Sequence, residues 1–238
     1  MRILSLALVL AVIFADVLIS PSGTGGFFPM HGIAYAQSQG ELGLNAQLLV
    51  AARNDDVATV QRVLDKGAAV DSRNRAGDTA LQIFIRKGNE AMARMLVDRG
   101  ANVNLRNLDK VSPLMTAAYN NQAGIAKLLL DKGADTDVQD QLGKTAMVYA
   151  AGQGHSRVVE VLLDAGVDVN KTYKHNLTAL MWAAGYGKAE TVKLLLDRGA
   201  DPALVDDRGK TARVIAEEAG RNEAAAVLAP ASPTEADR

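Results

Sequence analysis

A single interval of 33 residues recurs through most of this chain. A glycine followed by a small or apolar residue returns at that interval, at Gly67, Gly100, Gly133, Gly166 and Gly199. Twelve residues after each glycine stands a hydroxyl residue, which is Thr79, Ser112, Thr145, Thr178 or Thr211. An apolar doublet before each glycine and a pair of alanines in four of the units keep the same register. Markers that share one period without insertion or deletion indicate a stack of identical structural repeats.

Residues 140–172 show what each marker does within one unit. The Thr145 hydroxyl is suited to accept from free backbone N–H groups at the start of a helix, which we expect over residues 146–153. Gly154 allows a reversal, and apolar side chains at i, i+3 and i+4 predict a second helix over 156–164. Gly166 is expected to turn left-handed after that helix, and residues 167–174 to run extended into a tight turn. The predicted fold class is all-α.

These units resemble the ankyrin repeat. That repeat has a turn, Thr-Pro-Leu-His, two alanines, a glycine, a Val/Leu-rich helix and Gly-Ala-Asp-Val-Asn, and residues 100–104 (Gly-Ala-Asn-Val-Asn) match its last element closely. The resemblance covers residues 41–229 and implies a solenoid of about six helix-turn-helix units with β-turn or hairpin loops. The units are 41–73, 74–106, 107–139, 140–172, 173–205 and a shorter 206–229.

The chain departs from the ankyrin pattern at several positions. The motif histidine is replaced by Leu49, Gln82, Met115, Val148, Met181 and Val214. In the family that histidine links repeats by hydrogen bonds, so the resemblance implies that apolar packing replaces the link here. Phe84-Ile85 stands where two alanines are expected, which predicts a looser or shifted stack at that unit. Ala46 replaces the first Thr cap, and Glu217-Glu218 breaks the last alanine pair. Both end units are therefore expected to be caps with polar outer faces.

The N-terminal residues have the three parts of a secretory signal peptide. Arg2 precedes an apolar stretch from Leu6 to Ala15, and Ala34-Tyr35-Ala36 is a small-x-small cleavage site. We expect a signal peptide over 1–36, a linker over 37–40 and a mature chain beginning at Gln37. The apolar stretch is short for a membrane span, although an uncleaved anchor over residues 3–19 is the alternative. Residues 230–238 are predicted to be a disordered tail.

Composition and motifs argue against several kinds of chemistry. The chain has no cysteine, which excludes disulfides, thiolate metal sites and a cysteine nucleophile, and its net charge of -1 does not favour nucleic acid. His155 is expected to form a hydrogen bond at a helix start, and His175 is isolated in a turn. One aspartate per unit, at Asp65, Asp98, Asp131, Asp164 and Asp197, indicates a solvated structural edge. We expect no metal, no cofactor and no catalysis.

The ankyrin resemblance also implies a partner-binding surface. In that family the turn tips and the exposed sides of the first helices form a concave face that binds partners. The residues that this implies are Arg53, Arg73, Arg75, Arg86, Lys87, Arg106, Tyr119, Asn120, Leu142, Lys144, Lys174, His175 and Tyr186. Asp78 falls on the same face, whereas Tyr149 and Trp182 are expected to pack inside the stack. The first third is basic, which favours a partner with an acidic patch, and Arg and aromatic residues dominate interface hot spots.

The functional expectation is an exported, periplasmic and non-catalytic protein that binds a protein partner through this face. It would bind no nucleic acid, and no membrane once the signal peptide has been removed. One alternative is a secreted effector that binds host proteins. The other is a membrane-tethered scaffold, which requires residues 1–36 to be retained. The identity of the partner and the oligomeric state are left open by the sequence.

Overall fold

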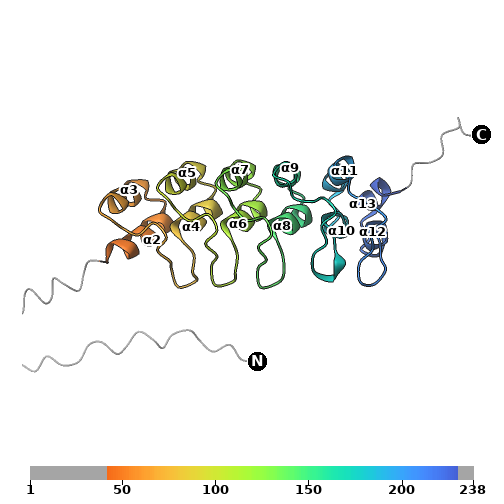
Figure 1. Cartoon of the computed structure of the whole chain (residues 1–238), viewed down its shortest axis with the longest axis horizontal. Coiled ribbons are helices and arrows are strands. Elements are labelled where there is room, and N and C mark those ends of the chain that lie inside the picture. Colours follow the sequence, from red (N-terminus) through yellow and green to blue (C-terminus); the bar gives the residue numbers. More distant parts are fainter. Residues whose placement is uncertain (1–41, 230–238) are drawn as a thin grey trace, which may run out of the picture. The chain divides into compact units, whose positions relative to one another are not determined.

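Six helix pairs stack in a row over residues 42–229, which are the residues that the computed structural model describes (Figure 1). The first helices are α2 (Leu44–Asn54), α4 (Ala80–Lys87), α6 (Pro113–Tyr119), α8 (Ala146–Gln153), α10 (Ala179–Gly185) and α12 (Ala212–Glu218). The second helices are α3 (Val57–Asp65), α5 (Glu90–Asp98), α7 (Ala123–Asp131), α9 (Ser156–Asp164), α11 (Ala189–Asp197) and α13 (Asn222–Val227). The predicted all-α repeat solenoid is confirmed. The predicted signal peptide (1–36), linker (37–40) and tail (230–238) lie outside the described residues.

The hydroxyl residues cap the first helices as their spacing predicts. The side chains of Thr79, Ser112, Thr145, Thr178 and Thr211 each accept a hydrogen bond from the backbone N–H three residues further on. Each bond satisfies one donor that has no partner within the helix. The first unit differs, because α2 already begins at Leu44 with Gly43 as its N-cap. Ala46, expected at the cap position, therefore lies inside the helix.

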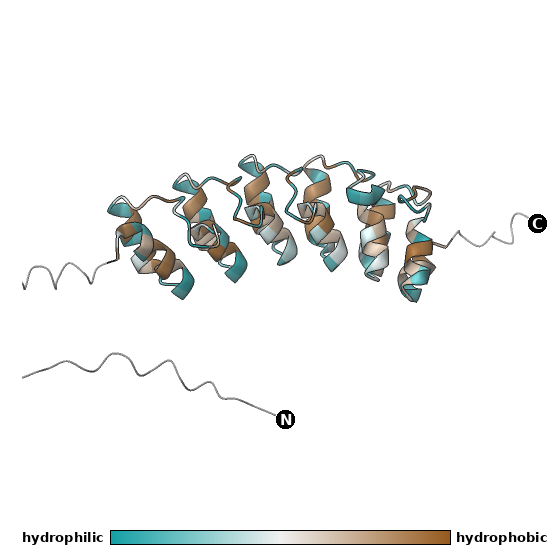
Figure 2. Ribbon diagram, turned by 90° about the horizontal axis from the view of Figure 1, so that it is seen from below, coloured by the Kyte–Doolittle hydropathy of each residue, from teal (hydrophilic) through white to brown (hydrophobic). Residues whose placement is uncertain are grey.

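Small side chains on the first helices and leucines on the second helices form the core. Both residues of the alanine pairs in α6, α8 and α10 are completely buried, as are Leu129, Leu162 and Leu195 of α7, α9 and α11. Burying one leucine side chain stabilises a fold by about 1.5–3 kcal/mol, and the four central units repeat that burial at Leu96, Leu129, Leu162 and Leu195. Figure 2 shows hydrophobic residues along the helices and hydrophilic residues at their ends and in the connecting turns.

Phe84 and Ile85 enter the same core in place of two alanines, and both are completely buried. Two large apolar side chains therefore occupy core positions that small alanines occupy in the next units, and the looser or shifted stack at this unit stays a prediction.

The polar link between repeats is retained at Gln82, contrary to the expectation that it would be lost throughout. Gln82 is completely buried, and its Nε2 donates to the Val111 carbonyl of the next unit at 2.8 Å. Its Oε1 accepts from the Thr79 N–H at 3.2 Å. A glutamine carries both a donor and an acceptor, so it can serve its own helix and the next unit together. At Met115, Val148 and Met181 buried apolar side chains occupy the equivalent position, as expected.

His155 stands at a helix start and forms a hydrogen bond there, as expected, and this bond links two units. It is the N-cap residue of α9, but its side chain forms no capping bond. Its Nε2 lies 3.0 Å from the Tyr119 carbonyl oxygen of the preceding unit. The ring therefore satisfies a carbonyl at the C-terminal end of α6.

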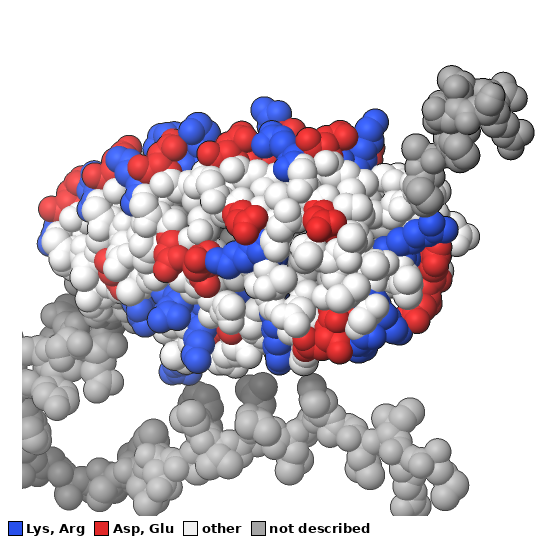
Figure 3. Space-filling model, turned by 45° about the vertical axis from the view of Figure 1, so that its right-hand side comes forward, with Lys and Arg blue, Asp and Glu red and all other residues white. Residues whose placement is uncertain are grey.

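Three of the five repeated aspartates form ion pairs with the following unit, at the ends of the second helices. Arg99 pairs with Asp65 at 2.6 Å and Arg198 with Asp164 at 2.8 Å, each cation reaching back to the preceding unit. Lys132 and Asp98 form a longer pair of 3.8 Å. Figure 3 shows the resulting alternation of red and blue side chains along the upper edge. Exposed pairs of this kind add little stability each, because water and salt screen them. The predicted structural edge is confirmed.

Both end units of the described stack expose polar residues together with a few apolar ones. In the last unit Ala216 is buried and Glu217 is exposed, so only the second alanine of the pair is replaced. Arg213 and Glu217 pair at 2.7 Å on the surface of α12, which agrees with a polar cap. The first unit exposes Leu42 and Val50, and the last unit exposes Val214 and Val227. The polar outer face of the two end units stays a prediction.

Candidate partner-binding surface

Five turns connect successive units and form a row at the lower edge of Figure 1. We number them turn 1 (73–78), turn 2 (106–111), turn 3 (139–144), turn 4 (172–177) and turn 5 (205–210). In four of them an Asn or Asp side chain accepts two backbone N–H groups of its own turn. Asn74 Oδ1, for example, accepts from Ala76 at 2.8 Å and from Asp78 at 3.0 Å. These Asx bonds fix the turn tips, so that exposed side chains project from a rigid base.

Backbone hydrogen bonds join neighbouring turns, with one interruption. Leu108 N–H donates to the Ala76 carbonyl at 3.0 Å, Gln141 to Asp109 at 3.2 Å and Asp207 to His175 at 3.2 Å. Lys174 N–H and the Leu142 carbonyl hold the equivalent positions in turns 4 and 3. Between residues 42 and 229, no backbone bond joins these two turns.

Turn 4 also has a different conformation from the other turns. Tyr173 stands where they have Asn or Asp, so the Asx bonds cannot form. His175 and Asn176 both adopt left-handed φ values, of 64° and 55°. The short 3-10 helix η1 (Lys174–Asn176) occupies the tip, where the sequence predicts extended chain up to Lys174. Tyr173 itself turns inward, and its burial raises the pKa of the phenol to about 12.

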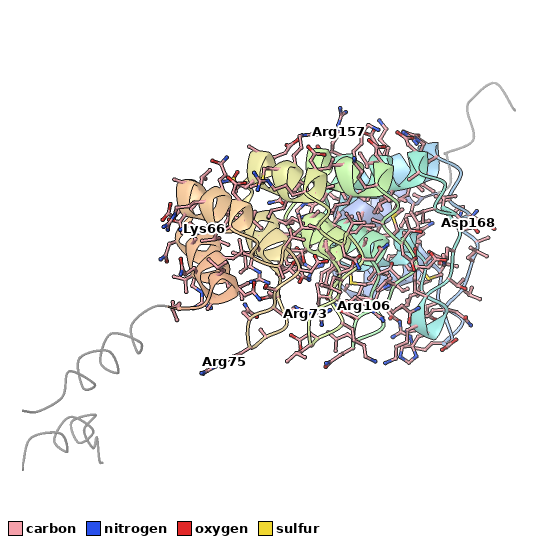
Figure 4. All side chains as sticks on the ribbon, turned by 60° about the vertical axis from the view of Figure 1, so that its left-hand side comes forward. Lys66, Arg73, Arg75, Arg106, Arg157 and Asp168 are labelled. Atoms are coloured by element: carbon pink, nitrogen blue, oxygen red, sulfur yellow. The ribbon has the colours of Figure 1, made fainter. Side chains whose placement is uncertain are left out.

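The basic residues predicted for this surface are mostly exposed on turns 1 and 2. Arg73, Arg75 and Arg106 project from the lower edge in Figure 4, away from Lys66 and Arg157 on the side of the second helices. Among the described residues none of these three arginines forms an ion pair. Turns 1 and 2 together therefore carry an unpaired basic cluster.

Other predicted residues lie at the ends of the first helices. Arg53 and Lys87 are exposed in the last turns of α2 and α4. Lys110, which the sequence reasoning missed, is exposed at the tip of turn 2 beside the acidic Asp109. Its left-handed φ of 62° matches the glycines at that position in turns 1, 3 and 5, a signal visible in the sequence as a missing glycine.

Asp78 is buried, which corrects its assignment to the exposed face, whereas Arg86 is exposed as expected and pairs with it. Arg86 Nη2 lies 3.1 Å from Asp78 Oδ1, and the Asp78 side chain is only 6% exposed. Asn107 Nδ2 of the next turn donates to the same carboxylate at 3.0 Å. A buried carboxylate needs such partners, so the Arg86 ion pair stabilises the folded state.

Aromatic side chains form a row across α6, α8 and α10. The Tyr119 and Tyr149 rings meet edge to face at 5.7 Å, and Trp182 stacks on Tyr186 at 6.0 Å. Tyr119 and Tyr186 are about half exposed, at 52% and 53%, as expected for surface residues. Tyr149 and Trp182 are half-buried and pack against the hydrophobic core, as the sequence predicts. Asn120 is half-buried too, and its amide donates to the Thr116 carbonyl at 2.8 Å.

Lys144 lies over this aromatic row. Its Nζ is 5.5 Å from the centre of the Tyr149 ring and 5.4 Å from that of Trp182, within range of cation–π attraction. The Tyr149 hydroxyl donates to the buried Asp140 carboxylate. Burial and this neighbouring carboxylate raise the pKa of Tyr149 above its usual value.

A pocket of about 180 Å³ opens between turns 3 and 4. Its lining is Leu142, Gly143 and Lys144 from turn 3, Tyr173, Lys174, His175 and Leu177 from turn 4, and Val148 and Trp182 from the helices behind them. Leu142 is 64% exposed at the rim. The structure thus brings four of the predicted residues together in one site: Leu142, Lys144, Lys174 and His175. One residue in the sequence indicates this site. Tyr173 of turn 4 stands where each of the other four turns has Asn or Asp.

The described residues include neither a metal-binding cluster nor a helix that could span a membrane. His175 faces Asp207 at 3.4 Å, and residues 42–229 contain no cluster of three or more His, Asp or Glu side chains that could hold a metal ion. No helix in the same part of the chain is long and apolar enough to cross a membrane.

Comparison with known proteins identifies the repeat type. A family model described as Ankyrin repeats (3 copies) matches three overlapping segments, residues 48–140, 99–173 and 147–237. No curated protein matches the chain. Ankyrin repeats act as modules for protein–protein interaction and are typically not enzymes. The matches, the 33-residue period and the observed stack agree, and the chain belongs to the ankyrin-repeat family.

Proposed function

We propose that this chain is an exported, periplasmic protein that binds a protein partner through the concave face of its repeats and carries out no reaction. The observation that carries the proposal is the basic cluster of turns 1 and 2. Arg73, Arg75 and Arg106 are exposed and form no ion pair in the described part of the chain. On the second helices, in contrast, most of the repeated charges are already paired with one another.

Unpaired arginines on rigid turns suit an acidic protein surface. Their charges speed the encounter with a partner of opposite sign, and the guanidinium group can bind carboxylates in a bidentate geometry. The exposed Tyr119 and Tyr186 rings add apolar area further along the row. Such a division into a charged end and an aromatic end is suited to a partner that spans several repeats.

Export is supported by the sequence of residues 1–36. The basic start, the apolar stretch and the Ala34-Tyr35-Ala36 site are those of a secretory signal peptide. The absence of cysteine from the chain is compatible with an oxidising compartment, where a free thiol is a liability.

Charge reversal on the turns tests the binding surface. In affinity capture from the native compartment, Arg75→Glu/Arg106→Glu should recover much less partner than the wild type. The control is Lys66→Glu/Lys193→Glu, which reverses two exposed charges on the side of the second helices. Both variants should unfold at the same temperature as the wild type. Equal recovery by the turn variant and the control would exclude the turn row as the binding surface.

The location of the protein is tested separately. Protein purified from a periplasmic extract should begin at Gln37. Recovery mainly from the culture medium would support a secreted effector instead. A membrane-bound protein that retains residues 1–36 would support a tethered scaffold.

A further inference from the structure

In two other units the residue equivalent to Lys144 is charged and forms an ion pair. The equivalent residue in the second unit is Asp78, which pairs with Arg86 eight residues further on. In the last unit Lys210 pairs with Glu218 at the same separation, at 2.6 Å. Eight residues after Lys144 stands Gly152, which has no side chain to offer. Lys144 forms no ion pair within residues 42–229.

The space beside Gly152 is filled by aromatic rings. A Cβ atom added at Gly152 would lie 3.6 Å from Tyr186 Cδ2 and 4.0 Å from Trp182 Cε3. The rings therefore take the place of the counter-ion that the other units carry there. They attract the ammonium group through their π faces but leave its charge uncompensated.

The nearby carboxylate of Asp140 is occupied by other donors. Its Oδ1 accepts from the backbone N–H groups of Leu142 at 2.8 Å and Lys144 at 2.9 Å. Its Oδ2 accepts from the Tyr149 hydroxyl. These bonds hold turn 3 in shape, and the Lys144 ammonium is left without an anionic partner.

A second donor at this place also lacks an acceptor. The indole Nε1 of Trp182 is buried and forms no hydrogen bond with any described residue. The charged groups that line the pocket are cationic, because Lys174 at its rim adds a second ammonium group and no Asp or Glu belongs to the lining. Leu142 and Leu177 supply apolar surface on its two walls.

We propose that the pocket between turns 3 and 4 receives an Asp or Glu side chain from a protein partner, with an apolar residue beside it in the partner sequence. The carboxylate accepts from Lys144 Nζ, and the apolar neighbour packs on Leu142 and Leu177. A volume of about 180 Å³ is suited to a single side chain. Charge complementarity selects the carboxylate, because a charged hydrogen bond to an ammonium group is stronger than a neutral one. This inference rests on the proposed function and specifies the partner chemistry at one end of the same surface.

Trp182 is the single tryptophan of the chain, so its fluorescence reports on this pocket alone. The probes are two capped peptides, Ser-Leu-Glu-Leu-Ser and Ser-Leu-Gln-Leu-Ser, titrated against the full chain. We expect a saturable change in Trp182 emission and a Kd about tenfold lower for the Glu peptide than for the Gln peptide. Lys144→Gln should abolish that preference, whereas Lys193→Gln, the same change on an exposed residue of α11, should keep it. Unchanged thermal unfolding of both variants ensures that binding is compared between folded proteins.

Several results would overturn the proposal. These are equal affinity for the two peptides, no saturable change with either, or an unchanged preference in Lys144→Gln. Competition by inorganic phosphate at lower concentrations than the Glu peptide would assign the pocket to a phosphoryl group instead. Peptide discrimination without partner capture would leave the pocket supported and contradict the proposed function. Partner capture that depends on Arg75 and Arg106, combined with no peptide discrimination, would contradict only the pocket.

Discussion

Reversing the charge of Arg86 should destabilise the fold, although the residue is on the surface. Two Arg86 nitrogens contact the Asp78 carboxylate, at 3.1 and 3.3 Å, and the Asp78 side chain is 6% exposed. Losing charged hydrogen bonds to a buried group costs about 1.5–3 kcal/mol, which the half-exposed Arg86 side chain reduces to roughly 1–2 kcal/mol. A glutamate at this place adds repulsion of about 1 kcal/mol. We expect Arg86→Glu to lower the free energy of unfolding by about 2–3 kcal/mol in total.

Thermal unfolding followed by circular dichroism measures this change. For a domain of this size the loss corresponds to a fall in Tm of roughly 4–10 °C. Lys87→Glu is the matched control, because Lys87 is the next residue of α4, is exposed and forms no ion pair among residues 42–229. Its Tm should stay close to that of the wild type, since surface substitutions usually change stability by less than about 0.5 kcal/mol. Equal Tm values for the two variants would refute the structural role of Arg86.

Three further perturbations test contacts within the stack. Gln82→Met removes the bonds to Thr79 N–H and the Val111 carbonyl and should lower the free energy of unfolding in urea by about 1–2 kcal/mol; an unchanged value would show that apolar packing replaces the link. Ala165 stands where three other units have Arg99, Lys132 and Arg198, and within residues 42–229 Asp131 pairs only with Lys127 of its own helix. Ala165→Arg should therefore add an ion pair with Asp131 and raise stability by up to about 0.5 kcal/mol at low salt, a gain that must vanish at high salt. Burial raises the pKa of Tyr173 from 10.0 to about 12. The neutral phenol is thus favoured in the folded state, and its contribution is intact below pH 10 and lost as the pH rises toward 12. In Tyr173→Phe the urea midpoint of unfolding should fall less steeply between pH 10 and pH 12 than in the wild type. The same pH dependence in both proteins would contradict the raised pKa of Tyr173.

Periodic sequence features predicted the repeat fold down to single residues. The bounds of α8 and α9, the hydroxyl caps and the left-handed Gly166 follow from local chemistry that each unit repeats. Such features need no knowledge of the neighbouring unit. They are therefore readable from one sequence.

Side-chain direction at the turns could not be predicted in the same way. Asp78 belongs to a turn by its position in the sequence, but it points inward because Arg86 and Asn107 satisfy its carboxylate there. The link through Gln82 was missed because an amide was treated as a loss of the motif histidine, although it has the same capacity to donate and accept. In both cases the decisive partner comes from a different element.

The pocket between turns 3 and 4 lies where the backbone bond between Lys174 and Leu142 is missing. A sequence pattern does not show directly that a bond is absent. Comparison of the second residue of each turn shows Tyr173 as the exception among Asn74, Asn107, Asp140 and Asp206. That substitution removes the Asx bonds and changes the turn backbone. The loss of the bond between Lys174 and Leu142 then becomes apparent only in three dimensions.

The interrupted bond between turns 3 and 4 also has a mechanical consequence. Turns 1 to 3 are joined to one another by backbone bonds, as are turns 4 and 5, so the row of turns consists of two hydrogen-bonded segments. The units behind the interruption stay joined on the other side of the stack, where the Asp201 N–H donates to Asn170 and Arg198 pairs with Asp164. A relative movement of turns 3 and 4 breaks no backbone bond between them, so we expect it to cost less than the same movement of any other neighbouring pair of turns. A side chain held in the pocket would restrict that movement.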